Sequence, residues 1–355
     1  MNRILVIQHK MIGDVLISSI ICNNLKKAYP NAQIDYLVND NTIDVLKGNP
    51  NIDSLIIFEK KHQNSTYELI KFALGLRKNK YDLVIDAYSK LQSWIIVLLC
   101  GGKRKISYKK IGRTFLYDDN IPYAENPSTN LGLAIERRLS LLTPLNLNFE
   151  LDGQPKLFLD KSEKDFADKI FENHKVNKSK KTVMISLLGS EKLKTYPLQY
   201  MTEIIDFISD TYNVNILFNY FPKQLEEAKI VFNSCKKSTQ QNIYFDLLGS
   251  NLREYIAIMN NCDLIIGNDG GAINLAKALN KPSFIIFSPW IEKKIWATFE
   301  DGKKHLSIHL NDITPNLINS KTEKELKENA IQLYEKLEPR FVIEKITPFL
   351  DSHLL

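Results

Sequence analysis

Near its start the chain reads Arg3-Ile-Leu-Val-Ile-Gln8 and, after a stretch of helical period at residues 14–29, Gln33-Ile-Asp-Tyr-Leu-Val38. Both quoted segments carry apolar residues on neighbouring positions, which is typical of strands buried on both faces in a parallel sheet. The stretch between them keeps its apolar residues on one helical face, and Pro30 follows its end. Strand, helix and strand in this order predict a doubly wound α/β domain.

The same alternation runs along the chain and restarts once, at Thr182. Further strands are expected at 54–58, 82–87, 182–188, 214–218, 243–247, 264–266 and 283–287, and further helices at 66–78, after Pro197, and at 224–233, 252–259 and 272–279. A hydrophilic stretch at 161–181 separates the two series. We therefore expect two doubly wound domains, residues 1–165 and 166–337, with a cleft between them at the carboxyl ends of their strands.

Composition predicts a folded, water-soluble chain. Of its 355 residues, 44% are hydrophobic and 25% charged, and the longest apolar run, 94–100, is far below the ~20 residues that a membrane-spanning helix needs. No signal peptide is indicated, because the apolar run after Met1 is short and His9-Lys10 follow at once. The four cysteines are scattered and form no CxxC pair, so we expect a reducing, cytoplasmic location.

The net charge of +6 is modest, but residues 103–113 hold six Lys or Arg side chains and no acid. Such a segment attracts an anionic partner, which could be a phosphorylated ligand, a membrane surface or nucleic acid; it could equally be a solvated basic loop. Nucleic acid is disfavoured, because only Tyr108 and Phe115 supply stacking aromatics there.

Several motifs are absent from the sequence. There is no GxGxxG after a strand, no P-loop, no HExxH, no GxSxG and no DxD carboxylate pair. These absences argue against a classical dehydrogenase, a P-loop NTPase, a zinc protease, an α/β hydrolase and a carboxylate-held Mg²⁺.

Three loops that follow expected strands remain as candidate sites. In the first, Gly13 permits a tight turn, and Asp14 is either a helix N-cap or a carboxylate that accepts a proton from a substrate hydroxyl. The second carries Gly189, Ser190 and nearby lysines, which could hold a phosphate or be merely solvated. In the third, 267–276, two glycines open a helix whose bare amides suit a diphosphate, although such a turn is common in crossovers.

Taken together, these loops are more specific than any one alone. The chain resembles glycosyltransferase family 9, the ADP-heptose:lipopolysaccharide heptosyltransferases. The matching segments are Ile12-Gly-Asp-Val-Leu16, Leu25-Lys-Lys-Ala-Tyr-Pro30, Ile34-Asp-Tyr-Leu-Val38, Gly189-Ser190, Lys194-Thr-Tyr-Pro197, Asp269-Gly-Gly-Ala-Ile-Asn-Leu-Ala-Lys-Ala-Leu-Asn-Lys-Pro282 and Ile285-Ile-Phe-Ser-Pro289.

The resemblance implies a GT-B fold, with two Rossmann-like domains that bind the acceptor (residues 1–165) and the nucleotide sugar (166–337). A C-terminal helix at about 338–355 could pack back on the first domain. The implied reaction is an inverting transfer, with Asp14 as general base and Lys194 offsetting the charge of the leaving diphosphate, and without metal or other cofactor. The implied donor contacts are Gly189, Ser190, Asp269, Gly270, Gly271, Ala272 and Asn274; the implied acceptor contacts are Lys10, Gly13, Lys103 and Arg104.

This sequence departs from the family's pattern at several of these positions. Gly270 stands where the family has a hydroxyl residue, Asn274 where it has His, Gln8 where it has Arg or Lys, and Lys10-Met11 where it has serines. The last two changes bear on acceptor recognition.

The leading hypothesis is therefore a cytoplasmic transferase that uses a nucleotide sugar, ADP-heptose in this family, and an anionic lipopolysaccharide-type glycolipid. Residues 103–113 would contact the acceptor or the inner face of the cytoplasmic membrane. A GT-B transferase that uses another nucleotide sugar, and a non-catalytic nucleotide-binding homologue, are the alternatives.

Overall fold

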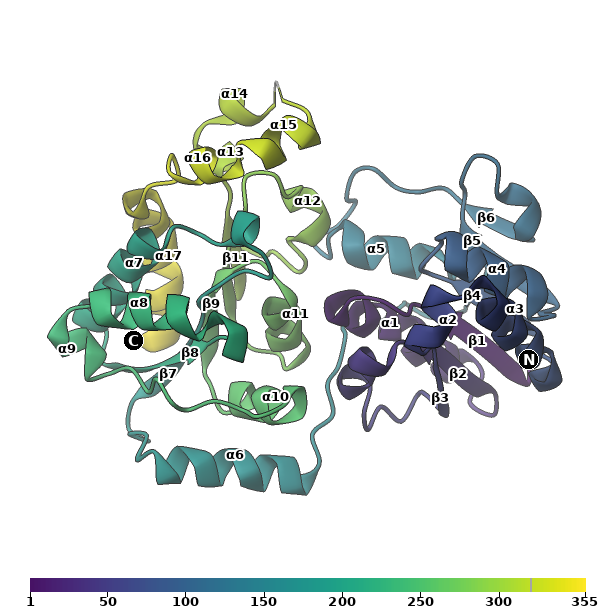
Figure 1. Cartoon of the computed structure of the whole chain (residues 1–355), viewed down its shortest axis with the longest axis horizontal. Helices are drawn as coiled ribbons and strands as arrows, with labels where there is room; N and C mark the ends of the chain where they lie inside the picture. Colours follow the sequence, from purple (N-terminus) through teal and green to yellow (C-terminus); the bar gives the residue numbers. More distant parts are fainter. Residues whose placement is uncertain (320) are drawn as a thin grey trace. The chain divides into compact units, whose positions relative to one another are not determined.

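A computed structural model describes residues 1–319 and 321–355 of the chain. The chain divides into two compact units, Met1–Phe158 and Leu159–Leu355 (Figure 1). The division precedes residue 165 because helix α6 (Lys161–Asn173) packs on α10 (Leu252–Asn260) of the second unit. A buried ion pair between Glu163 and Arg253, at 2.6 Å, ties these two helices together.

The first unit is a six-stranded parallel sheet in the order β3-β2-β1-β4-β5-β6. Its strands are β1 (Arg3–Ile7), β2 (Gln33–Val38), β3 (Ser54–Ile57), β4 (Leu83–Asp86), β5 (Arg104–Tyr108) and β6 (Asp119–Ile121). Its helices are α1 (Ile12–Ala28), α2 (Lys60–Asn64), α3 (Thr66–Gly75), α4 (Leu91–Leu99) and α5 (Leu133–Ser140). This strand order is that of a Rossmann fold, so the doubly wound prediction is confirmed.

The second unit is a five-stranded parallel sheet in the order β11-β10-β9-β7-β8. Its strands are β7 (Lys181–Ser186), β8 (Val214–Asn219), β9 (Leu264–Asn268), β10 (Ser283–Ile286) and β11 (His305–Ile308). Besides α6 and α10 its helices are α7 (Leu198–Thr211), α8 (Leu225–Ser234), α9 (Lys237–Gln240), α11 (Gly271–Ala278), α12 (Lys293–Trp296), α13 (Leu310–Ile313), α14 (Pro315–Ile318), α15 (Glu323–Glu328), α16 (Ala330–Tyr334) and α17 (Pro339–Leu354). This sheet is doubly wound as well.

The C-terminal helix α17 packs on α7, β10 and β11, within the second unit. Its buried face includes Val342, Ile346, Phe349 and Leu350, which belong to the hydrophobic core of that unit. A hydrogen bond of 2.7 Å from the Tyr212 hydroxyl to the Asp351 carboxylate closes the contact with the end of α7. The structure thus gives this helix a place in the second unit's core, whereas the sequence pattern suggested the first.

The expected strand at 243–247 is wrong. Ile243 forms a single parallel bridge to Ile216, and Leu247 N–H already turns back to the carbonyl of Tyr244. The apolar run packs on the core without continuing the ladder. Conversely, the sequence did not predict β5, β6, β11 and α4, which are basic, very short or uniformly apolar, or α5, which is a short amphipathic helix.

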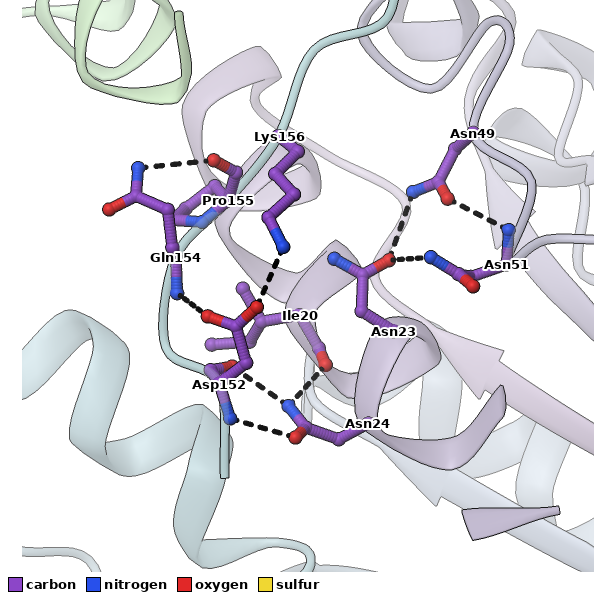
Figure 2. A network of polar contacts seen from close by, with 9 residues as sticks. All are labelled: Ile20, Asn23, Asn24, Asn49, Asn51, Asp152, Gln154, Pro155 and Lys156. Carbon is purple, nitrogen blue, oxygen red and sulfur yellow. Dashed lines mark hydrogen bonds and ion pairs between the residues drawn. The ribbon is translucent and has the colours of Figure 1, made fainter. Parts of the chain in front are cut away.

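The segment between the two units is held on α1 by amide side chains (Figure 2). Asn24, buried in α1, donates to the carbonyls of Ile20 and Asp152 at 2.8 Å each and accepts from the Asp152 N–H at 2.9 Å. The Asp152 carboxylate in turn accepts from Gln154 N–H and from the Lys156 ammonium, both at 2.8 Å. A buried side chain therefore substitutes for the missing strand partner of this extended segment.

Replacing Asn24 with alanine is expected to lower the free energy of unfolding of the first unit by about 1–3 kcal/mol, because both Asp152 backbone groups lose their partner. Urea unfolding followed by circular dichroism measures the change. Asn51→Ala, which removes one hydrogen bond from half-buried Asn51 to Asn23, is the control and should cost less than about 1 kcal/mol. Equal losses for the two variants would contradict this account.

Candidate functional site

Each sheet has a switch point, on either side of which successive strands are added in opposite directions. Such a point is suited to bind a ligand. In the first unit this switch lies between β1 and β4, and in the second between β7 and β9. Loops that leave neighbouring strands at a switch diverge to opposite faces, which opens a crevice at the carboxyl ends of the strands. The loops after β1 and β7 and the one after β9 are the three that the sequence singled out.

Asp14 lies in the first turn of α1, directly after the loop that follows β1. The N-cap of this helix is Met11, so the capping role that the sequence left open for Asp14 is excluded. Met11 adopts a φ of 65°, which is rare for a residue with a side chain and is found where a loop is shaped for a function. Gly13 lies between the two, in the same turn.

The Asp14 carboxylate pairs with Arg138 of α5, with 2.5 Å between Oδ1 and Nη2. The buried guanidinium also donates to the hydroxyl of Ser18 and to the carbonyl of Ala134, at 3.2 and 3.1 Å. Burial works against its charge, but Asp14 together with nearby tyrosines outweighs burial and raises the pKa of Arg138. Asp14 is thus held as an oriented carboxylate, one of whose oxygens is occupied by Arg138. Sequence reasoning missed Arg138, whose only signal is an arginine on the buried face of α5.

Lys103 and Arg104 do not lie at this edge. They stand at the amino end of β5, where Lys103 pairs with Asp82 and Arg104 with Asp119, each at 2.7 Å. Parallel strands place their amino ends on the side of the sheet opposite Asp14. The sequence could not show which basic residues lie at the Asp14 edge, because lysines and arginines stand at both ends of β5.

Cations at the Asp14 edge include Lys10 after β1, Lys90 after β4, and Lys110 and Arg113 after β5. The Lys110 ammonium donates to the Ser89 carbonyl at 2.7 Å, and burial lowers the pKa of Lys110. The Arg113 guanidinium lies 4.5 Å from the centre of the Trp94 ring. This edge therefore attracts an anionic ligand.

Unsatisfied polar atoms gather at the same edge. In the described part of the chain, the following atoms here are buried without a hydrogen-bond partner: Nε2 of His9, the hydroxyls of Ser89 and Tyr108, and the indole N–H of Trp94. Burial lowers the pKa of His9 to about 4, so its imidazole is neutral at physiological pH. Buried polar groups without partners are rare, and several at one sheet edge indicate a polar ligand.

A buried carboxylate organises the loop that carries Lys90. Asp86, the last residue of β4, accepts from the N–H groups of Tyr88 and Ser89 at 3.1 and 2.8 Å. It also accepts from the hydroxyls of Ser93 and Tyr117, at 2.7 Å each. Burial raises the pKa of Asp86, and these hydrogen bonds oppose the rise. The role of Asp86 is structural.

In the second unit, Asn268 joins the loops of the switch. The last residue of β9 and fully buried, it donates from its side-chain amide to the carbonyls of Ser186 and Leu187, at 3.0 and 2.8 Å. Its side-chain oxygen accepts from Tyr196 N–H at 2.7 Å. The backbone after β7 and the backbone after Lys194 are thus tied to the start of the third loop.

Lys194 is brought to this loop by close packing. Gly189 is buried against the backbone of Lys194, and a Cβ on Gly189 would lie 2.4 Å from the Lys194 carbonyl oxygen. The carbonyl of the neighbouring Leu193 accepts from the Ser288 hydroxyl and from the indole N–H of Trp290, at 2.7 and 3.1 Å. The ammonium of Lys194 lies 5.3 Å from the centre of the Trp290 ring. Trp290, which the sequence reasoning missed, therefore positions Lys194.

Beside Lys194 the helix α11 begins. Its N-cap Gly270 has no side-chain cap, and Gly271 and Ala272 follow with N–H groups that have no acceptor within the helix. A side chain added at Gly270 or Gly271 would meet nothing within 4 Å. Asn274 lies partly exposed on the next turn, and Ser190 is exposed at the tip of its loop.

The Lys194 ammonium lies 4.0 Å from the Asp269 carboxylate. Burial raises the pKa of Asp269, while the charges of Lys194 and Lys277 oppose the rise. A cation, a helix N-terminus and open backbone amides thus occupy one place, which suits a phosphate or diphosphate. Among residues 1–319 and 321–355, no cluster of three His, Cys, Asp or Glu side chains could hold a metal ion.

Solved structures of similar fold place the chain in a class. A glycosyl transferase of family 9 from Veillonella parvula superimposes with a TM-score of 0.82 at 17% identity, covering 99% of this chain and 98% of that one. The ADP-heptose lps heptosyltransferase II of Escherichia coli gives 0.73 at 18% identity, covering 99% of both chains. These likenesses show the fold, which is the expected GT-B fold of two Rossmann-like units.

Sequence comparison gives the family. The model of glycosyltransferase family 9 (heptosyltransferase) matches residues 69–326. Lipopolysaccharide heptosyltransferase 1 of Campylobacter coli is 30% identical over 294 residues, which cover 80% of this chain and 83% of that protein. The chain belongs to glycosyltransferase family 9 and is a glycosyltransferase, as its loops predicted.

Gly189→Ala is expected to force the Lys194 loop away and to lower the free energy of unfolding of the second unit by about 1–3 kcal/mol, because the new methyl group overlaps backbone. Gly270→Ser is the control, since there is open space at Gly270 and serine is a favoured N-cap. Thermal unfolding compares the two variants. A well-tolerated Gly189→Ala would show that the close approach is not required.

Lys277 gives a prediction on pH. This lysine of α11 is buried, donates to the carbonyl and hydroxyl of Thr298 at 2.6 and 3.1 Å, and has its pKa lowered to about 8 by burial, against Glu300, Asp269 and Asp301. Because the unfolded chain holds this proton more tightly than the folded one, Lys277 makes stability rise as the pH rises through the folded pKa.

The unfolding free energy of the natural protein minus that of Lys277→Met should therefore increase by about 1 kcal/mol between about pH 7 and about pH 9. Urea unfolding at a series of pH values measures it. A difference that stays constant or shrinks over this range would contradict the lowered pKa.

Proposed function

We propose that this glycosyltransferase moves heptose from ADP-heptose onto a lipopolysaccharide core acceptor, with inversion at the anomeric carbon. Its relatives carry the names of lipopolysaccharide heptosyltransferases, and a protein of the same fold is named for ADP-heptose. Two observations carry the proposal. The first unit holds an oriented carboxylate, and the second holds a lysine beside the uncapped N-terminus of α11.

The carboxylate of Asp14 acts as the base. The Oδ1 atom is occupied by Arg138, so Oδ2 accepts the proton of the acceptor hydroxyl. The acceptor oxygen forms a bond to the anomeric carbon of heptose as the bond from that carbon to the diphosphate oxygen breaks. The diphosphate leaves with the electron pair from the face opposite the attack, and the configuration inverts. Arg138 is a positioning residue, which holds the Asp14 side chain in its orientation.

The second unit stabilises the leaving group. Lys194 and the N–H groups of Gly270, Gly271 and Ala272 offset the negative charge that grows on ADP. Gly189 and Ser190 bring the loop after β7 to the diphosphate, and Asp269 and Asn274 contact the donor sugar. Because a lysine and a helix N-terminus supply the positive charge, we propose that transfer requires neither a metal ion nor another cofactor.

The anionic acceptor binds the first unit. Lys10, Lys110 and Arg113, with Gly13 in the adjacent turn, take the place that the sequence gave to Lys103 and Arg104, because they share the edge of Asp14. A glycolipid of this kind is reached from the inner face of the cytoplasmic membrane, so we propose a cytoplasmic location with peripheral membrane contact. The departures at Gly270 and Asn274 favour a second candidate, transfer from another nucleotide sugar, which the experiment below separates.

Asp14→Asn is expected to lower the rate of ADP release from ADP-heptose and a core acceptor by about 10³-fold or more, since the amide cannot take the proton. Binding of ADP, measured by calorimetry, should be unchanged. Asp40→Asn, at an exposed carboxylate directly after the loop that follows β2, is the matched control and should keep full activity.

Activity of Asp14→Asn within several-fold of the natural protein would remove Asp14 from its role. A panel of nucleotide sugars runs in parallel. Release of a nucleotide from a different sugar nucleotide, with none from ADP-heptose, would replace the donor and keep the mechanism. A chain that binds nucleotide and transfers no sugar would be the non-catalytic homologue.

A further inference from the structure

The outer face of α3 and α4 in the first unit is apolar where a helix exposed to water is usually polar. Figure 1 shows the two helices next to one another, and they pack together extensively. Half of the exposed large hydrophobic side chains in the described part of the chain belong to these helices and to the loop after β5. They are Tyr67, Ile70, Leu74, Leu91, Leu98, Ile111 and Phe115, and we call them the α3–α4 face.

Helical spacing puts the exposed apolar side chains of each helix on one side of that helix, and the segment with Phe115 contacts α4. Ile70 and Leu74 are four residues apart on α3, and Leu91 and Leu98 are seven apart on α4. The inner sides of both helices fill the core of the unit, through residues such as Leu69, Ala73, Ile96 and Val97. The outward apolar residues are thus additional to those that the fold needs. Ile111 is fully exposed and Phe115 is 78% exposed.

The charge around this face is mostly positive. Residues 87–117 contain seven lysines and arginines and no acid, and residues 69–81 contain four and no acid. Lys103 and Arg104 are neutralised by Asp82 and Asp119. Exposed Lys71, Lys78 and Lys109 form no ion pair with any described residue. Glu68, between Tyr67 and Ile70 on α3, is the acid nearest to the face in sequence, and Asp118 follows its last residues.

We propose that the α3–α4 face docks the protein on an anionic phospholipid bilayer, with Leu98, Ile111 and Phe115 inserted between head groups and the lysines on the lipid phosphates. Apolar tips interleaved with cations are the pattern of proteins that lie on a membrane. A second copy of this chain would fit poorly, because two such basic faces repel and stable homodimer interfaces are depleted of charge. Among the described residues no helix is long and apolar enough to span a bilayer.

The face is continuous with the proposed acceptor edge. Leu91 begins α4 just after β4, and Ile111 follows β5, so both lie at the carboxyl ends of strands, as Asp14 does. An acceptor anchored by lipid tails would then present its sugars to Asp14 while the protein stays on the surface. This last step rests on the proposed function; docking to lipid does not.

The test is flotation of the full chain with vesicles of phosphatidylglycerol and phosphatidylethanolamine, compared with phosphatidylcholine alone. The natural protein should float with the anionic vesicles at low salt and separate from them at high salt. Leu98→Ser/Ile111→Ser should lower the partition coefficient about tenfold or more, because two apolar side chains no longer enter the lipid. Ile230→Ser/Ile331→Ser, at exposed apolar residues of the second unit, is the matched control and should bind as the natural protein does.

A second measurement reports contact directly. All four native cysteines are buried, so an environment-sensitive dye on Ile111→Cys labels one site. Its emission should shift to the blue on anionic vesicles, and the same dye on Ile230→Cys should not shift. Circular dichroism of the Ser variants checks that they are folded.

The proposal is overturned if the chain does not bind anionic vesicles, if the two pairs of variants lose binding equally, or if the changes at Leu98 and Ile111 instead abolish a concentration-dependent dimer. ADP release with a water-soluble, delipidated acceptor keeps the two proposals apart. Leu74→Ser/Leu98→Ser, at two exposed residues of the face outside residues 103–113, should weaken vesicle binding and retain that activity. Vesicle binding without sugar transfer would contradict the proposed function and support the docking face.

Discussion

The second unit depends on one side chain, the amide of Asn268. Parallel strands end with polar backbone groups that must find partners as their loops diverge, and at the switch between β7 and β9 two such loops leave together. The Asn268 amide donates to two carbonyls at the end of β7, those of Ser186 and Leu187, and accepts from the N–H of Tyr196, just before α7. Together with the hydrogen bonds of Ser288 and Trp290 to the Leu193 carbonyl, it fixes the Lys194 loop beside the start of α11.

The first unit uses the same device with a different residue. Asp86 ends β4 at the switch and holds the loop that follows through two backbone N–H groups and two hydroxyls. A carboxylate fits there because only donors surround it, whereas Asn268 must both donate and accept. In each unit a buried polar group costs free energy unless satisfied, and full satisfaction makes the loop rigid. The loops beside these anchors carry Lys90 and Lys194.

Several unfavourable features lie together at the Asp14 edge. The unpartnered atoms of His9, Ser89 and Tyr108, the positive φ of Met11 and the cluster of cations all lie there. The unpartnered atoms and the cations are unfavourable in the isolated protein, and the anionic, hydroxyl-bearing ligand proposed above would give them partners. Features that destabilise a fold are expected where a protein binds its ligands. The exposed apolar side chains of the α3–α4 face, next to this edge, are another such feature.

By itself the sequence determined two doubly wound units, most of their strands and the loops that carry Asp14, Lys194 and Gly270, because buried strands, amphipathic helices and glycine turns are written in local periodicity. It did not determine strand order, which depends on hydrogen bonds between distant segments. Only the tertiary structure could therefore bring Arg138 to Asp14 across 124 positions, tie Asn268 to Tyr196, or put Lys103 and Arg104 on the wrong side of the sheet for the site. A basic residue gives the same signal in the sequence whether it lies before or after a strand. The direction of the chain through the folded sheet decides which end of the strand meets the ligand.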